Sequence, residues 1–222
     1  LNIAFLMDPL EKLDLKGDTT FALALEAQKR KHHINFFKPE DLILRNNDVL
    51  ANICKLELSS YNNLCEFKYH DSFIKPLSLY DVIMMRQDPP FDMAYISATH
   101  ILEKLPNSTL VVNNPFEVRN SPEKIFVTNF SHLMPKTLIS RNIDTIKDFR
   151  KQFKDIIIKP LYGNGGQGVF HVLPEDENLN SILEMFFSQN KEPLMIQEYL
   201  NDVRNGDKRI ILLNGEIVGA IN

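Results

Sequence analysis

The sequence predicts a layered α/β unit with a mostly parallel sheet, followed by an α+β unit with an antiparallel sheet. Three observations lead to this fold class. Over residues 1–120, short apolar runs alternate with segments of helical periodicity, an order typical of parallel strands connected by helices. From residue 121 onward, the expected order becomes helix, strand, helix, strand, with a glycine-rich loop between two strands. An Asn214-Gly215 pair between two apolar runs then indicates a tight hairpin, because both central positions of such a turn need positive φ.

The first unit is expected to begin with a buried strand over residues 1–7. Asp8-Pro9 ends this strand, because proline cannot donate a hydrogen bond to a neighbouring strand. Asp18 is a good N-cap residue, since its carboxylate can accept from the free N–H groups of a first helical turn, and a helix is therefore expected from about residue 19 to 30. Apolar periodicity further predicts strands over 34–37, 82–85 and 110–112 and a helix over 93–105.

The second unit is expected to open with a helix that has Ser121 as N-cap and Pro122 at its first position, and we place the domain boundary there. Beyond it we expect strands over 136–140, 155–159, 168–173 and 194–198 and helices over 143–153 and 179–189. The hairpin strands cover 210–213 and 216–221. Because a two-stranded hairpin is not an independent domain, we expect the last unit to be cut short at Asn222. The expected domains are 1–120, 121–200 and 201–222.

Composition limits the class of protein. The chain has 222 residues, of which 44% are hydrophobic and 24% charged, which predicts a packed globular core. The net charge of -4 argues against a broad nucleic-acid surface. The first apolar run, Ile3 to Met7, is too short for a signal peptide or a membrane span. Cys54 and Cys65 have neither zinc-ligand nor redox spacing, so we expect reduced cysteines in a soluble, cytoplasmic protein, with a single disulfide as the alternative.

The most informative segment runs from Ile156 to Gly168, where a lysine ends an apolar strand and a proline and four glycines follow. Glycines let backbone N–H groups approach phosphate oxygens, because no Cβ stands in the way. The segment is not a Walker loop, since its lysine precedes the glycines. Nor is it a dinucleotide fingerprint, because β-prone residues follow where a helix should start. We interpret it as a hairpin loop over nucleotide phosphates, with an ordinary flexible hairpin tip as the alternative.

Six segments spread along the chain form a further pattern. They are Met7-Asp8-Pro9, Asp18 to Ala22, Met85 to Asp92, Asn120 to Lys124, Ile158 to Leu161 and Gly206 to Arg209. Arg86 to Asp92 is the most specific of them, because unrelated folds have little reason to carry Arg-x-Asp-Pro-Pro-Phe-Asp. In this order the segments resemble the bacterial glutathione synthetases, a family of ATP-grasp ligases. The resemblance covers essentially the whole chain and implies an α/β domain followed by an ATP-grasp fold that is incomplete here.

The resemblance implies an ATP-dependent ligase that joins γ-glutamylcysteine to glycine through an acyl phosphate. Lys124 and Lys159 would neutralise the ATP phosphates, and Arg86 would bind substrate carboxylate oxygens. Lys159 and Arg209 are the implied catalytic residues. The other implied contacts are Asp18 and Thr19 in the dipeptide site together with Arg209, then Gly163, Asn164, Gly165 and Gly166 in a mobile lid, Gln197, Glu198, Tyr199 and Leu200 around adenine, and Asp207 at the ribose.

The same resemblance implies cofactors and partners. Phosphoryl transfer needs charge neutralisation and positioning more than a protein nucleophile, so ATP and Mg²⁺ are expected and a catalytic triad is not. The Mg²⁺ ligands are expected beyond Asn222 and none in this chain, which would leave the chain alone inactive. We expect γ-glutamylcysteine and glycine as small-molecule partners, a homo-oligomer, and neither nucleic acid nor membrane as a partner.

Other readings stay open at this point. The parent could be another ATP-grasp carboxylate–amine ligase, such as a D-alanine–D-alanine enzyme, and this chain could be a non-catalytic nucleotide-binding module. Lys124 could be a solvated helix lysine, and Arg86 could pair with Asp88 or Asp92, because buried charges are usually paired. The prolines after Asp88 could form a rigid turn with a cis bond. Asp207 could cap a strand or pair with its lysine neighbour.

Overall fold

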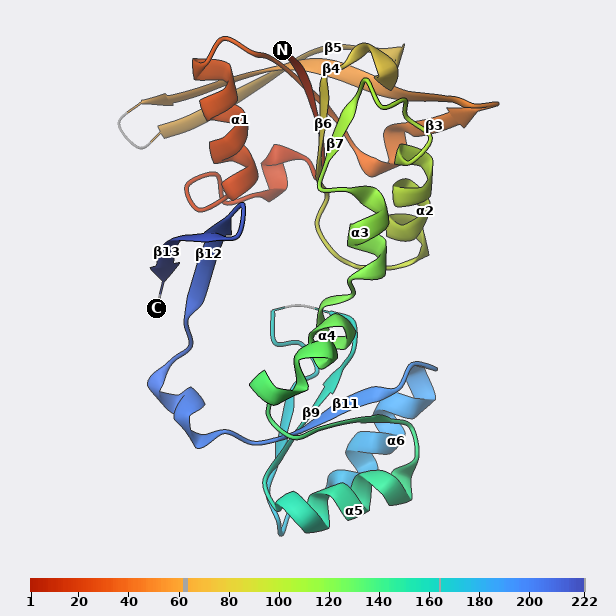
Figure 1. Cartoon of the computed structure of the whole chain (residues 1–222), viewed down its shortest axis with the longest axis vertical. Coiled ribbons are helices and arrows are strands. Elements are labelled where there is room, and N and C mark those ends of the chain that lie inside the picture. Colours follow the sequence, from red (N-terminus) through yellow and green to blue (C-terminus); the bar gives the residue numbers. More distant parts are fainter. Residues whose placement is uncertain (62–63, 164, 222) are drawn as a thin grey trace. The chain divides into compact units, whose positions relative to one another are not determined.

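The computed structural model describes residues 1–61, 64–163 and 165–221 and divides into two compact units (Figure 1). The first unit holds Leu1–Phe126 together with Tyr162 and Gly163, and the second holds Val127–Leu161 and the described residues from Gly165 onward. Across these ranges, we find no helix with both the length and the apolar character needed to cross a membrane. Each unit has its own sheet and its own core, so each is described separately.

The first unit is built on a seven-stranded mixed sheet. Parallel pairs join β1 to β2, β1 to β6 and β6 to β7, whereas β4 pairs antiparallel with β2, β3 and β5. The strands are β1 (Asn2–Met7), β2 (His33–Phe37), β3 (Leu42–Arg45), β4 (Asp48–Tyr61), β5 (Leu64–Pro76), β6 (Val82–Arg86) and β7 (Leu110–Val112). The helices are α1 (Thr19–Lys29), α2 (Met93–Leu102), α3 (Pro115–Asn120) and α4 (Glu123–Phe126), with short 3-10 helices at Leu10–Lys12, Pro39–Asp41 and Leu77–Leu79. The parallel pairs around β1 confirm the predicted layered α/β unit.

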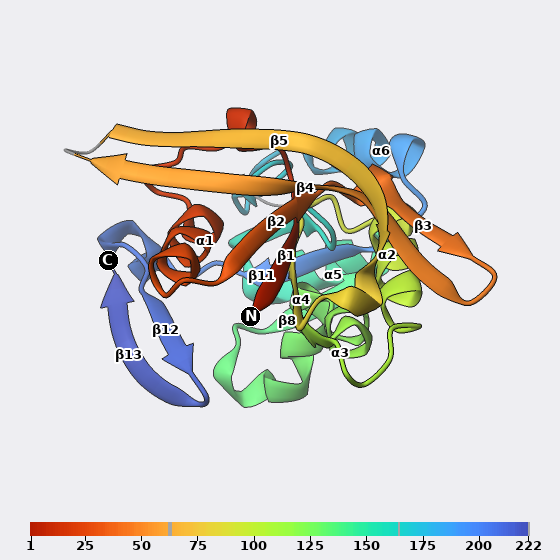
Figure 2. The same ribbon diagram turned by 90° about the horizontal axis from the view of Figure 1, so that it is seen from above.

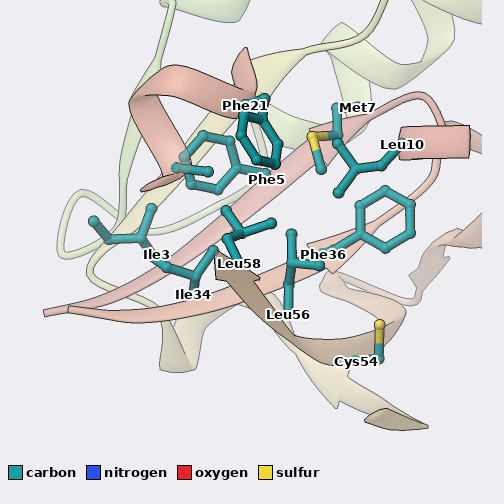
Figure 3. Close-up of a cluster of buried hydrophobic side chains, with 11 residues drawn as sticks. Ile3, Phe5, Met7, Leu10, Phe21, Ile34, Phe36, Cys54, Leu56 and Leu58 are labelled. Carbon is teal, nitrogen blue, oxygen red and sulfur yellow. The ribbon is translucent and has the colours of Figure 1, made fainter. Parts of the chain in front are cut away.

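Strand β1 is apolar along its whole buried length because both of its faces are covered. Phe5 packs in one core cluster with Phe21 of α1, and Leu6 packs in another with Leu102 of α2. Figure 3 shows the rings of Phe5 and Phe21 close together. A strand with two buried faces loses the alternation of polar and apolar residues, which explains its continuous apolar run.

The two helix starts predicted from capping residues have different outcomes. Asp18 does cap α1, since its carboxylate accepts from the Phe21 N–H at 2.7 Å, and the helix begins at Thr19 as predicted. The prediction that Ser121 caps the next helix is wrong. Its N–H donates to the Val118 carbonyl at 3.4 Å and closes α3, an earlier helix. The following helix begins at Glu123, one residue after the predicted first position Pro122.

The long strands β4 and β5 are missing from the sequence prediction, which assigns no element between residues 38 and 81. Figure 2 shows them side by side as a long antiparallel pair. Pairing with β2 and β3 covers only the first part of β4. Beyond it, the Gln28 amide of α1 takes the place of a strand. It donates to the Leu58 carbonyl at 2.6 Å and accepts from the Leu58 N–H at 2.9 Å.

The second unit contains a four-stranded antiparallel sheet in the order β10-β9-β11-β8 and a separate two-stranded sheet. The first is formed by β8 (Thr137–Ser140), β9 (Ile156–Pro160), β10 (Phe170–Val172) and β11 (Leu194–Glu198), and the second by β12 (Arg209–Leu213) and β13 (Glu216–Ile221). The helices are α5 (Ile143–Phe153) and α6 (Leu179–Gln189), with 3-10 helices η4 (Val127–Leu133) and η5 (Asn201–Asn205). This arrangement confirms the predicted α+β unit with an antiparallel sheet.

The core of the second unit lies on one face of its four-stranded sheet. Ile156 and Ile158 of β9 pack there with Ile146 of α5 and Leu183 of α6. Because side chains alternate along a strand, Lys159 must lie on the opposite face from this core. Gln197 shares this opposite face with Lys159, whereas Glu198, the register partner of the core residue Ile156, lies on the core face.

Candidate functional site

In the first unit, the candidate site lies at the carboxyl ends of the parallel strands β1 and β6, whose last residues Met7 and Arg86 are register partners. Arg86 donates from Nη2 to Thr19 Oγ1 at 2.9 Å and from Nε to Thr20 Oγ1 at 3.1 Å. The structure therefore brings the predicted residues Arg86 and Thr19 together, directly beside the capping residue Asp18. The carboxyl edge of an open parallel sheet is also the usual place for a ligand.

The Arg86 guanidinium is held by hydroxyl groups and not by an acid. Asp92 serves as the N-cap of α2, where it accepts from the Tyr95 N–H at 3.0 Å. Over residues 1–61, 64–163 and 165–221, no ion pair joins Arg86 to Asp88 or Asp92, so the ion-pair alternative is wrong for this structure. Within the same ranges, Arg86 Nη1 has no hydrogen-bond partner, which leaves one edge of the guanidinium for a ligand carboxylate.

Three carboxyl groups, those of Asp8, Asp18 and Asp88, interact electrostatically in this part of the first unit. The Asp88 N–H donates to Asp8 Oδ2 at 2.9 Å, which links the residues that follow β6 and β1. Partial burial, and then the negative charges of Asp8 and Asp18, raise the pKa of Asp88, while Arg86 opposes this change. A site with one guanidinium and several carboxylates can bind the carboxylate and the ammonium group of one zwitterionic substrate.

Sequence reasoning did not assign Asp8, Thr20 or Asp88 to the site. Asp8 and Asp88 follow two strands that were predicted, and both lie inside the quoted motifs. Their position after neighbouring parallel strands was therefore a usable signal. Thr20 also lies inside a quoted motif, Asp18 to Ala22, but its contact with Arg86 spans 66 residues of sequence and could not be read from the motif. The Pro89-Pro90 peptide bond is cis, which agrees with the alternative that the prolines after Asp88 form a rigid turn with a cis bond.

Lys124 and Gly163, both predicted to contact ATP phosphates, are adjacent in the first unit. Lys124 Nζ donates to the Gly163 carbonyl at 3.0 Å. Gly163 has a φ of 118°, a value that residues with a Cβ rarely adopt. The structure thus places a candidate phosphate-binding cation against the start of the glycine loop. Asn164, the next residue of the predicted lid, lies outside the described residues.

The other loop glycines have two different reasons to be glycine. Gly165, Gly166 and Gly168 all have positive φ, at 61°, 74° and 69°. A Cβ on Gly168 would lie 3.3 Å from both Phe186 and Pro160, a tight contact that the two side chains could relieve only by shifting. A Cβ on Gly165 or Gly166 would meet nothing within 4 Å. Their open surroundings suit backbone groups that must be reached by a ligand, and their lid role stays a prediction.

Lys159 and Gln197 lie on the face of the four-stranded sheet that is opposite the core. Gln197 is the register partner of Ile157, and both belong to the same face as Lys159. The buried Gln197 side chain donates from Nε2 to Thr137 Oγ1 at 2.9 Å. Its amide nitrogen is therefore engaged within the sheet, on the face that it shares with Lys159.

The segment predicted to surround adenine keeps few backbone donors. The Glu198 N–H donates to the Lys136 carbonyl and the Tyr199 N–H to the Asp155 carbonyl, each at 3.0 Å. The Leu200 carbonyl accepts from Val203, but the Leu200 N–H has no partner in the described part of the chain. Of the three residues, Leu200 is thus the one whose backbone N–H remains for a nucleotide base.

Asp207 and Arg209 lie in the segment that follows the four-stranded sheet of the second unit. Asp207 follows Gly206, which has a φ of 102°, and Arg209 begins β12. Both are exposed. As far as the structure describes the chain, neither makes a side-chain hydrogen bond or ion pair, and this includes the suggested pair with Lys208. Their predicted contacts with ribose and substrate stay predictions.

Among the residues that the structure describes, no group of three or more histidine, cysteine, aspartate or glutamate side chains is arranged to hold a metal ion.

Comparison with known proteins adds independent findings. Residues 1–119 match the family model of the prokaryotic glutathione synthetase N-terminal domain, and residues 123–222 match that of the prokaryotic glutathione synthetase ATP-grasp domain. A glutathione synthetase from Brucella melitensis is 52% identical over 222 residues, which are 100% of this chain and 71% of that protein.

Two solved structures share the fold at low identity. A RimK-domain ATP-grasp protein from Sphaerobacter thermophilus has a TM-score of 0.66 at 14% identity and covers 99% of this chain and 72% of its own. The ATP-grasp ligase PsnB, solved with Mg and ADP, has a TM-score of 0.57 at 15% identity over 98% of this chain and 70% of its own. At these identities the likeness concerns the fold alone.

Proposed function

Because the chain belongs to the prokaryotic glutathione synthetase family, we propose that it provides the dipeptide site and much of the nucleotide site of an ATP-dependent carbon–nitrogen ligase. The ligase completes glutathione by joining γ-glutamylcysteine to glycine. The observation that carries the proposal is the contact of Arg86 with Thr19 and Thr20 at the carboxyl edge of the parallel sheet. Two motifs that lie more than 60 residues apart in the sequence meet there.

The chemistry requires activation of a carboxylate, which is a poor electrophile. ATP transfers its γ-phosphoryl group to the carboxylate of γ-glutamylcysteine, and an acyl phosphate and ADP form. The amine of glycine then attacks the carbonyl carbon, and inorganic phosphate leaves as the peptide bond forms. Lysines, arginines and backbone donors suit this sequence of steps, because it calls for charge neutralisation and positioning.

In this proposal the first unit binds the dipeptide. The free edge of the Arg86 guanidinium binds a carboxylate of γ-glutamylcysteine, and Asp18 and Thr19 line the same pocket. The carboxylates of Asp8 and Asp88 favour the ammonium group of the γ-glutamyl moiety. Support comes from the hydrogen bonds that join Arg86, at the end of β6, to Thr19 and Thr20 at the start of α1, and Asp88 to Asp8 after β1.

The nucleotide is bound by both lysines and by the glycine loop. Lys124 and Lys159 neutralise phosphate charge, and Gly163, Asn164, Gly165 and Gly166 close over the phosphates as a lid. The Leu200 N–H meets the base, next to Gln197, Glu198 and Tyr199. Asp207 binds the ribose, and Arg209 binds the substrate and the transferring group. A phosphate oxygen at Lys124 would replace the Gly163 carbonyl as its partner.

ATP and Mg²⁺ are the proposed cofactors. The fold neighbour PsnB was solved with Mg and ADP, which supports nucleotide and metal use by this fold. The described part of the chain offers no cluster of acidic side chains that fits the metal, so no step is assigned to it here. A cytoplasmic location and a homo-oligomeric state complete the proposal.

Calorimetric titration with ATP in the presence of Mg²⁺ tests the nucleotide site. Lys159→Ala should weaken ATP binding at least tenfold, about 1.4 kcal/mol, because it removes a charge that faces the phosphates. Lys151→Ala is the matched control, since Lys151 is exposed on α5 and pairs with Asp148. Equal affinity of the Lys159→Ala chain and the unaltered chain would contradict the assignment. Formation of glutathione from γ-glutamylcysteine and glycine by the ligase then tests the reaction.

A further inference from the structure

A compact group of side chains beside the candidate adenine segment has no role so far. His171 of β10 stacks on Tyr199, with ring centroids 3.9 Å apart and planes 23° from parallel. Asp155, just before β9, lies under the same pair, because its carbonyl accepts from the Tyr199 N–H at 3.0 Å. His171 is the register partner of Ile157. The stack therefore lies on the same sheet face as Lys159 and Gln197.

The polar atoms of this group are shielded from water without a regular hydrogen bond. His171 Nε2 and Asp155 Oδ1 are buried atoms that have no hydrogen-bond partner in the described residues, and they face each other at 3.6 Å. Burying polar atoms without partners costs free energy, and an apolar pair would avoid that cost. The core of this unit has no use for such a pair, since it lies on the other face of the sheet. A role on the sheet face that carries Lys159 and Gln197 explains the buried pair of His171 and Asp155 better than a role in the core.

Tyr199 is held from three directions by this arrangement. Its ring lies against His171, its N–H is bonded to Asp155, and its hydroxyl accepts from Arg204 Nε at 2.8 Å. Tyr199 precedes Leu200, whose N–H is the remaining donor for a base. Fixing Tyr199 thus also fixes the direction of the next peptide group. A site that is already ordered loses less conformational freedom when its ligand binds.

We infer that His171 is a positioning residue for the nucleotide base, which acts by stacking on Tyr199 and is itself oriented by Asp155. The inference deepens the proposed nucleotide site and rests on it. His171 makes no contact with the ligand in this account. It holds Tyr199 and Leu200, the segment that contacts the base, and it does so through the flat aromatic surface of its ring.

The test compares ATP affinity, measured by calorimetry in the presence of Mg²⁺, for the unaltered chain and the variants H171A, H171F and H132A. H171A should weaken ATP binding about tenfold, and H171F, which keeps an aromatic plane, should stay within about threefold of the unaltered chain. H132A is the matched control, because His132 is exposed in the same unit. If H171A does not fold by circular dichroism, H171L replaces it and the comparison with H171F stands.

A double-mutant cycle with Y199A shows whether His171 acts through Tyr199. In the Y199A background, H171A should cause no further loss of ATP affinity. A second full loss, an unchanged affinity of H171A alone, or an H171F chain as weak as H171A would each overturn the inference while the proposed function stands. If the unaltered chain binds no ATP, the nucleotide site of the proposed function fails, and the inference fails with it.

Discussion

The two units build their parts of the candidate site in different ways. In the first unit, side chains hold one another, and Arg86 is fixed by the hydroxyls of Thr19 and Thr20. In the second unit, Lys159 is joined by main-chain features, namely glycines with positive φ and a backbone N–H at Leu200. Side-chain chemistry should therefore decide dipeptide binding, whereas backbone conformation should decide how the nucleotide loop is formed.

The largest effect is expected at Arg86. Arg86→Met should weaken γ-glutamylcysteine binding about 100-fold, or about 2.7 kcal/mol, because charge-assisted bonds to a carboxylate are lost. Calorimetry with the dipeptide measures the change, and Arg45→Met, an exposed position on β3 of the same unit, is the control. Dipeptide affinity that survives the Arg86 change would place the substrate carboxylate elsewhere.

A smaller change in the same site sharpens this result. Thr20→Val keeps the branched shape of a buried side chain and removes only the acceptor of the Arg86 Nε–H. The dipeptide affinity should fall about fivefold, since one hydrogen bond is worth about 1 kcal/mol. A loss as large as that of Arg86→Met would mean that Thr20 itself contacts the substrate.

In the second unit, conformation can be tested with two glycines. Gly168→Ala should lower the free energy of unfolding by about 1–2 kcal/mol for its left-handed backbone and by a further ~1–3 kcal/mol for the clash with Phe186 and Pro160. Gly165→Ala has a similar φ and open space, so it should show only the first cost. Urea titration of both variants measures the difference. Equal losses of unfolding free energy in the two variants would show that Phe186 and Pro160 move aside at no cost when Gly168 is replaced.

The smallest effect concerns Asp88. Its pKa is raised in the folded chain, so its contribution to stability is complete below the unfolded pKa and is lost as the pH rises through the folded value. Asp88→Asn removes this loss. The variant should match the unaltered chain in acid and become slightly more stable toward pH 7, by little because the residue is exposed. Urea titrations of both chains between acid and pH 7 measure this difference in stability. A variant that is less stable than the unaltered chain at pH 7 would contradict the predicted direction.

Local signals in the sequence were enough for much of the fold. The helices 143–153 and 179–189 and the strand 194–198 were predicted with the bounds that the structure has. Strands β4 and β5 were missed although apolar and polar residues alternate along parts of both, as at Leu56 to Leu58 and Phe67 to Tyr69, so a usable strand signal was overlooked. Ser121 was misassigned because the cap of an earlier helix, at Asn114, was overlooked.

The candidate site shows a similar division, between residues that local sequence reveals and contacts that only the tertiary structure reveals. Arg86, Thr19 and Lys124 were found because they lie in local motifs. The partners that these residues contact are set by the tertiary structure. Neither the bond from Arg86 to Thr20 nor the stack of His171 on Tyr199 has any trace in local sequence, because each contact is set by how strands and helices pack.

The two hydrogen bonds between Gln28 and Leu58 bear on how this sheet avoids association with other chains. Beyond its pairing with β2, strand β4 would present the bare edge of a sheet, and such an edge readily recruits a strand from another chain. The Gln28 amide satisfies both backbone groups of Leu58 at that edge. One glutamine on a helix thus helps keep neighbouring molecules from joining their sheets into insoluble assemblies.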